Sequence, residues 1–96
     1  MKSFEKIIGQ LSLGQFEFSR HAFKRAVERN ISELEIKWAG GRARIIEDYP
    51  DDKYSPSCLL LGFTETGRPL HIQVSYADSD LVKIITIYGN YSGCLG

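Results

Sequence analysis

The sequence predicts an α+β protein in which N-terminal helices pack on one face of a four-stranded antiparallel meander sheet. In the first forty residues, apolar side chains recur every three to four positions, which is the period of an amphipathic helix. After Gly40 and Gly41 the pattern changes to the apolar runs and alternation of strands, separated by short polar turns. Because neither an amphipathic helix nor a sheet buries its apolar side alone, we expect the helices to cover the sheet.

Two helices are predicted before residue 31. Four apolar residues at helical spacing indicate the first, over residues 4–13: Phe4, Ile7, Ile8 and Leu11. Residues 16–18 alternate Phe with Glu and should form a brief extended segment. Ser19 is the expected N-cap of the second helix, and Asn30 ends it because asparagine tolerates the left-handed conformation.

A third helix is predicted to begin at Ser32, because Ser32 and Glu35 form a capping box. Leu34 and Trp38 are four residues apart and share one face of this helix. We expect that face to pack on the sheet, which would make Trp38 a core residue.

The strands are predicted over residues 43–49, 57–64, 69–76 and 81–88. The third alternates most clearly and places three polar side chains on one face: His71, Gln73 and Ser75. We expect residues 1–88 to form one domain and the glycine-rich residues 89–96 to form a flexible tail.

Composition and missing motifs argue against several classes of function. The 12 basic and 12 acidic residues cancel, so any RNA contact must come from a local patch. The chain has no apolar run near the roughly 18 residues that span a bilayer, and its start does not resemble a secretory signal. We therefore expect no membrane segment and a cytoplasmic location.

The two cysteines and the lack of common catalytic motifs favour a function without a metal or cofactor. Cys58 and Cys94 form neither a disulfide framework nor a zinc motif, and both should be reduced thiols. The sequence contains no glycine-rich phosphate loop, nucleophile elbow, or His-Glu-x-x-His pattern.

The second helix carries the first candidate site, because His21, Arg25 and Arg29 fall on one of its faces. An imidazole beside guanidiniums suits a general base, and arginines hold phosphate with forked donors. The alternative is a solvated surface on which both arginines pair with carboxylates: Glu28, Glu33 or Asp48.

The sheet carries the remaining candidates. The polar row of His71, Gln73 and Ser75 either lines a binding face or faces water. Three further residues could contact phosphate, stack on bases or transfer protons: Lys83, Tyr88 and Tyr54. Tyrosines at strand ends are also common packing residues.

Several segments together resemble a small prokaryotic family of domains of unknown function. They are the helix motif His21-Ala22-x-x-Arg25-x-x-x-Arg29-Asn30-Ile31-Ser32 and strand segments within residues 45–49, 61–71 and 84–88. The resemblance covers about residues 16–88, and that family is similar to the RelE and BrnT toxins of type II toxin–antitoxin pairs. It implies a RelE-like fold and a metal-independent endoribonuclease that acts on mRNA.

In such a nuclease the ribose 2′-hydroxyl attacks the adjacent phosphate, which requires a base, an acid and cations. On this hypothesis we assign proton transfer to His21 or His71, and acid catalysis or base stacking to Tyr88. Phosphate binding falls to three cations: Arg25, Arg29 and Lys83. The implied partners are an RNA substrate and a cognate antitoxin.

A non-catalytic module that uses the same fold to hold a protein partner, such as an antitoxin or a neighbouring subunit, is the alternative. The zero net charge and the glycine-rich tail favour it, because a stand-alone nuclease requires neither.

Overall fold

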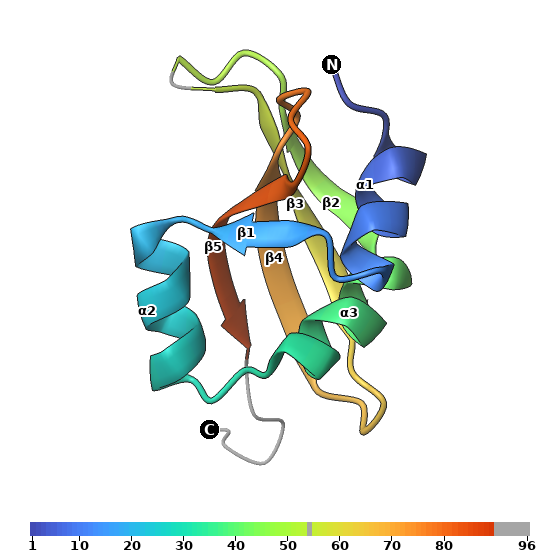
Figure 1. Ribbon diagram of the computed structural model, residues 1–96, viewed down its shortest axis with the longest axis vertical. Coiled ribbons are helices and arrows are strands. Elements are labelled where there is room, and N and C mark those ends of the chain that lie inside the picture. Colours follow the sequence, from blue (N-terminus) through green and yellow to red (C-terminus); the bar gives the residue numbers. More distant parts are fainter. Residues whose placement is uncertain (54, 90–96) are drawn as a thin grey trace.

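The computed structural model describes residues 1–53 and 55–89, and these form three helices and five strands (Figure 1). In chain order they are α1 (Phe4–Ser12), β1 (Phe16–Phe18), α2 (Arg20–Glu28), α3 (Glu33–Gly41), β2 (Arg44–Tyr49), β3 (Ser57–Phe63), β4 (Pro69–Ser75) and β5 (Val82–Gly89). Within these ranges, no helix is long and apolar enough to cross a membrane. The α+β class is confirmed.

The sheet is five-stranded and mixed, with the strand order β1-β5-β4-β3-β2, so the predicted four-stranded antiparallel sheet is wrong. Strands β2 to β5 form the expected antiparallel meander. The fifth strand is β1, which pairs in parallel with β5 from Phe16 opposite Val82 to Phe18 opposite Ile84. Backbone hydrogen bonds at both ends of β1 extend this pairing, from Val82 N to Gln15 O and from Ser19 N to Ile84 O.

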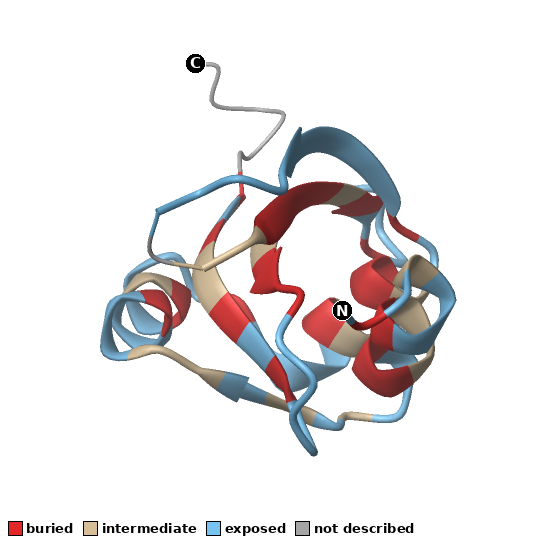
Figure 2. Cartoon of the chain, turned by 90° about the horizontal axis from the view of Figure 1, so that it is seen from above, coloured by how far each residue is buried: buried red, intermediate tan, exposed pale blue. Residues whose placement is uncertain are grey.

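The helices do not all cover the same face of the sheet, contrary to the prediction. Helices α1 and α3 pack together on one side of the sheet, and α2 lies on the other side of β5 (Figure 2). We call the side that carries α2 the open face, because α2 packs only over β5 and β1. This arrangement follows from β1, whose parallel pairing leads the chain past the edge of the sheet.

The core lies between the sheet and the pair α1 and α3. Its fully buried large side chains are Ile7, Leu11, Ile36, Leu60, Leu70, Ile72, Val74, Val82, Ile84 and Ile87. The predicted alternation along β4 is confirmed, because Leu70, Ile72 and Val74 are buried while His71 and Gln73 are only half-buried. Cys58 is a buried free thiol, and Cys94 lies outside the described residues.

Small residues let α3 approach both the sheet and helix α1 closely. A Cβ atom added to Gly62 of β3 would lie 2.1 Å from the carbonyl oxygen of Ala39, and one added to Gly40 would lie 2.9 Å from Leu11 Cβ. Helix α3 therefore buries Ile36, Ala39 and Gly40.

The prediction that Trp38 is a core residue is wrong. Trp38 is 38% exposed and Leu34 is 74% exposed, because both lie away from the small-residue face of α3. The guanidinium of Arg42 lies over the Trp38 ring, 3.7 Å from its centroid. On α2, too, small residues face the sheet and large ones do not: the alanines are buried, while Phe23 and Val27 are exposed.

The predicted helix starts are confirmed. The Ser19 hydroxyl accepts a hydrogen bond from Ala22 N, and Ser32 and Glu35 form the full capping box. Asn30 has φ of 55°, the left-handed conformation expected where α2 ends. Residues 90–96 of the predicted tail lie outside the described residues, and Gly89 belongs to β5.

Candidate functional site

A hollow of about 210 Å³ lies between α2 and the end of β5. Its lining residues are His21, Arg25, Arg29, Thr86, Ile87 and Tyr88. His21 and Arg25 of α2 and the C-cap residue Arg29 follow one another at intervals of four residues, which places them on one side of the helix. The helix set predicted from the sequence therefore meets Tyr88, which the sequence placed among the sheet candidates.

His71 adjoins this hollow through Tyr88. The two residues are paired across β4 and β5, and their rings stack with centroids 4.7 Å apart and planes within 7° of parallel. Nδ1 of His71 is buried and has no hydrogen-bond partner among the described residues. The stacked pair thus places the second imidazole behind Tyr88, on the neighbouring strand β4, with its ring orientation set by packing.

The hollow is lined by two arginines, Arg25 and Arg29, and Arg25 forms an ion pair with Glu28. Arg25 lies 4.0 Å from Glu28, one turn along α2, and both side chains are more than 40% exposed. An exposed ion pair of this kind contributes less than about 1 kcal/mol, so it does not hold Arg25 away from an anion. Asp48, another pairing partner that the alternative considered, instead accepts a 2.7 Å hydrogen bond from the Tyr76 hydroxyl.

Residues 18–89 match the family described as Domain of unknown function (DUF4258). The chain belongs to the DUF4258 family. Helix α2, strands β2 to β5 and every residue of the hollow lie inside the matched span, whereas α1 and the first two residues of β1 precede it. No curated protein and no solved structure gives a significant match to the chain.

Within the DUF4258 span, the other predicted site residues do not line the hollow. Lys83 lies near the start of β5, opposite Glu17 of β1. Gln73 donates a 3.1 Å hydrogen bond to the Ser57 hydroxyl, and Ser75 lies 3.2 Å from the Ser55 hydroxyl. Both side chains therefore interact with serines of neighbouring segments, and Ser75 is buried. Tyr54 lies outside the described residues.

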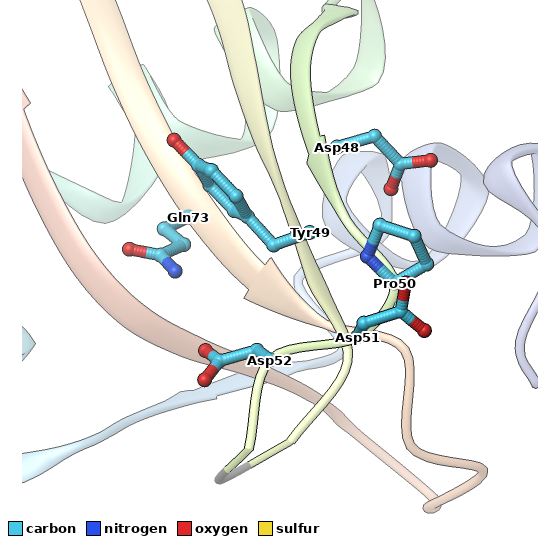
Figure 3. A pocket seen from close by; sticks show the side chains of 6 residues that line it. All are labelled: Asp48, Tyr49, Pro50, Asp51, Asp52 and Gln73. Carbon is cyan, nitrogen blue, oxygen red and sulfur yellow. The ribbon is translucent and has the colours of Figure 1, made fainter.

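A wider pocket, of about 550 Å³, opens at the other end of the open face (Figure 3). Its lining residues are Asp48, Tyr49, Pro50, Asp51, Asp52 and Gln73. In Figure 3 the side chains of Tyr49, Gln73 and Asp52 gather on one side of the strands, while those of Asp48 and Asp51 point away. The three aspartates that line this pocket repel phosphate. The hollow beside α2 is therefore the better anion site, although its volume is smaller.

Electrostatic surroundings in the DUF4258 sheet favour protonated tyrosines away from the hollow. The Tyr49 hydroxyl donates to the Glu47 carboxylate, and this hydrogen bond raises the pKa of Tyr49. Burial, followed by the hydrogen bond to Asp48, raises the pKa of Tyr76. In the described part of the domain, no three His, Cys, Asp or Glu side chains group closely enough to hold a metal ion.

Sequence reasoning missed Thr86 and Ile87 as lining residues and did not place Arg44 on the same face of the sheet as His71 and Tyr88. Strand register aligns Arg44 with Leu61, Leu61 with His71, and His71 with Tyr88, so the four lie in one row across the sheet. Residues in such a row project to the same face. Only the strand pairing brings these residues together, and no local sequence pattern predicts that pairing.

Proposed function

We propose that this protein is a RelE/BrnT-like toxin of a type II toxin–antitoxin pair and acts as a metal-independent endoribonuclease on mRNA. The observation that carries the proposal is the stacked pair of His71 and Tyr88 beside a hollow lined by His21, Arg25 and Arg29. A RelE-like fold is part of the same proposal. Helices that precede the antiparallel meander of β2 to β5 support it.

The residues of the hollow match the needs of RNA transesterification. One imidazole takes the proton of the 2′-hydroxyl as its oxygen attacks the phosphorus, and the second group, an imidazole or the Tyr88 phenol, protonates the departing 5′-oxygen. The guanidiniums of Arg25 and Arg29 stabilise the charge that develops on the phosphoryl oxygens. The products are a 2′,3′-cyclic phosphate and a 5′-hydroxyl.

The neutral net charge sets how the protein meets its substrate. With no global positive field, attraction of RNA rests on the cations of the hollow. Two arginines on single-stranded RNA give a slope of about −1.4 in log affinity against log salt concentration. This shallow slope distinguishes a local site from the extended basic surface of a strongly charged nuclease.

The first test is inducible expression followed by growth measurement and mapping of cellular RNA ends. His71→Ala and Arg25→Ala should abolish growth arrest and remove the new RNA ends. Lys24→Ala is the matched control, because Lys24 is an exposed cation on α2 that does not line the hollow. Lys83→Ala tests the remaining sequence prediction, since an effect would mean that RNA also runs along β5.

The second test uses purified protein and a short RNA in the presence of a metal chelator. Cleavage should persist, yield a cyclic phosphate, and stop when a single 2′-deoxy nucleotide replaces the cleaved residue. Loss of a proton-transfer group lowers the rate by roughly 10²- to 10⁴-fold, which sets the size expected for His71→Ala. Unchanged growth arrest and cleavage in both His71→Ala and Arg25→Ala would refute the assignment.

A non-catalytic protein-binding module of the same fold is the second candidate. Exposed apolar side chains support it, with Phe23 and Val27 on α2 and Leu34 and Trp38 on α3. Apolar and aromatic groups of this kind anchor protein interfaces. On this hypothesis the purified wild type cleaves no RNA, and adding the product of an adjacent short reading frame changes the Trp38 fluorescence.

A further inference from the structure

Arg68 occupies an unusual position for a charged residue. It lies at the end of the turn between β3 and β4, and its side chain is only 9% exposed. One terminal nitrogen donates to Arg29 O at 2.7 Å, and the other donates to Asn30 O at 3.2 Å. The second nitrogen also lies 3.4 Å from the Glu35 carboxylate.

These contacts follow from the way α2 ends. The last carbonyl groups of a helix have no intrahelical donors and carry the negative end of the helix dipole, so a cation is favourable there. The left-handed conformation of Asn30 turns the chain at this point, and a guanidinium can reach two successive carbonyl groups because its donors form a fork. Glu35 compensates the buried charge and also accepts a hydrogen bond from Ser32 N at 2.9 Å. Arg68 therefore ties the end of α2 to the start of α3.

The turn that carries Arg68 is itself held in place. Thr64 N donates to Arg68 O at 2.9 Å, and Arg68 N donates to the Thr64 hydroxyl at 3.0 Å. Gly67 adopts φ of 89°, which glycine reaches without strain. The Arg68 side chain therefore extends from a turn whose backbone is held by hydrogen bonds.

Arg68 also lies beside the end of β5, the strand that forms the other side of the hollow. A Cβ atom added to Gly89, which follows Tyr88 on β5, would lie 3.3 Å from Arg68 Nε and 2.7 Å from a Leu70 methyl group. One side chain therefore donates to the backbone of Arg29, the C-cap residue of α2, and lies beside Gly89 at the end of β5. Arg29 and Tyr88 are lining residues on the two sides of the hollow.

We propose that Arg68 is a positioning residue that fixes the end of α2 against β5 and so sets the spacing between the arginines of the hollow and the His71–Tyr88 pair. Its own guanidinium is engaged by two carbonyl groups and a carboxylate, so it acts through Arg29 rather than on a phosphate. The geometric part of this inference rests on these contacts alone. Its effect on RNA cleavage rests on the proposed function.

The main variant is Arg68→Lys, which keeps the charge near Glu35 but loses the fork that spans two carbonyl groups. Glu35→Gln is a milder second variant, which keeps an acceptor for Ser32 N if Arg68→Lys does not fold. Arg42→Lys is the matched control, since Arg42 is an exposed arginine over Trp38 and away from the hollow.

Two readouts separate positioning from general stability. Amide hydrogen exchange over residues 24–31 should accelerate at least tenfold in Arg68→Lys while core amides of β4 keep their protection. Kinetics on a short RNA should show kcat reduced by roughly 10- to 100-fold, because displacements near 1 Å cost about that much, with KM changed far less. Arg42→Lys should match the wild type in both.

The possible outcomes distinguish this inference from the proposed function. Wild-type exchange at the end of α2 in both Arg68→Lys and Glu35→Gln would overturn the positioning role, whatever the RNA activity. Faster exchange with wild-type kcat, in a protein that does cleave RNA, would overturn its link to the site. Faster local exchange in a protein that cleaves no RNA would support the positioning of α2 while refuting the nuclease.

Discussion

Replacing Gly62 with alanine tests how closely α3 packs on the sheet. The new Cβ atom would lie 2.1 Å from the Ala39 carbonyl oxygen and 2.7 Å from its carbonyl carbon. An ordinary contact starts near 3.4 Å, so α3 must retreat by about 1.3 Å or β3 must bend. Neither atom is a flexible side chain that could turn away. Because the strain falls on backbone atoms of α3 and β3, we expect a loss of about 3 kcal/mol in the free energy of unfolding.

The assay is urea denaturation at 25 °C together with thermal unfolding. For a domain of this size, about 3 kcal/mol corresponds to a fall in Tm of roughly 12–24 °C. Gly9→Ala is the matched control, because Gly9 lies within α1 with nothing within 4 Å of its added Cβ. This control should raise the free energy of unfolding by about 0.5–1 kcal/mol through helix propensity. A Gly62→Ala protein as stable as the wild type would show that the close contact between α3 and β3 is wrong.

Three further predictions concern single residues. Because Trp38 is 38% exposed, iodide should quench its fluorescence readily in the native protein. Fluorescence that iodide does not quench would show that Trp38 is buried after all. Burial raises the pKa of Tyr76 above its usual 10.0, so the unfolded chain releases this proton first and the free energy of unfolding should fall as the pH rises above 10. Denaturation curves at alkaline pH should show a smaller fall for Tyr76→Phe, and an identical fall would contradict the assignment. Asn30→Gly should preserve stability at φ of 55°, whereas Asn30→Val should cost on the order of 1–2 kcal/mol in chemical denaturation, and equal stability of the two variants would argue against the left-handed turn.

Local signals predicted the helix starts well because capping is a contact between residues three apart. Ser19 and Ser32 both cap helices as expected, and the antiparallel meander follows from short turns. The parallel pairing of β1 could not be predicted in this way, since its partner strand lies at the other end of the domain and three residues carry little pattern. The number of strands and the side of the sheet that α2 covers both depend on that pairing.

Trp38 shows why the spacing of large apolar residues can predict the wrong buried face of a helix. The helix face that packs closest to a sheet is the one whose residues are small enough, and Ala39 of α3 against Gly62 of β3 allows a backbone approach that a tryptophan does not permit. For the candidate site, the spacing of His21, Arg25 and Arg29 was readable because it lies within one helix. Their meeting with Tyr88 and His71 depends on tertiary packing, so the sequence presented them as separate sets.

The parallel pairing of β1 with β5 also governs when the protein can mature. Residues 16–18 have no pairing partner until residues 82–84 have been synthesised. This pairing between distant residues raises the contact order of the domain, and β1 cannot join the sheet before β5 is made. Helix α2 packs on that same strand, and Tyr88 comes from it. A nascent chain on the ribosome, or a truncated product ending before β5, therefore carries all of the α2 cations but no assembled hollow. Biosynthesis itself delays completion of the site until almost the whole domain has been translated.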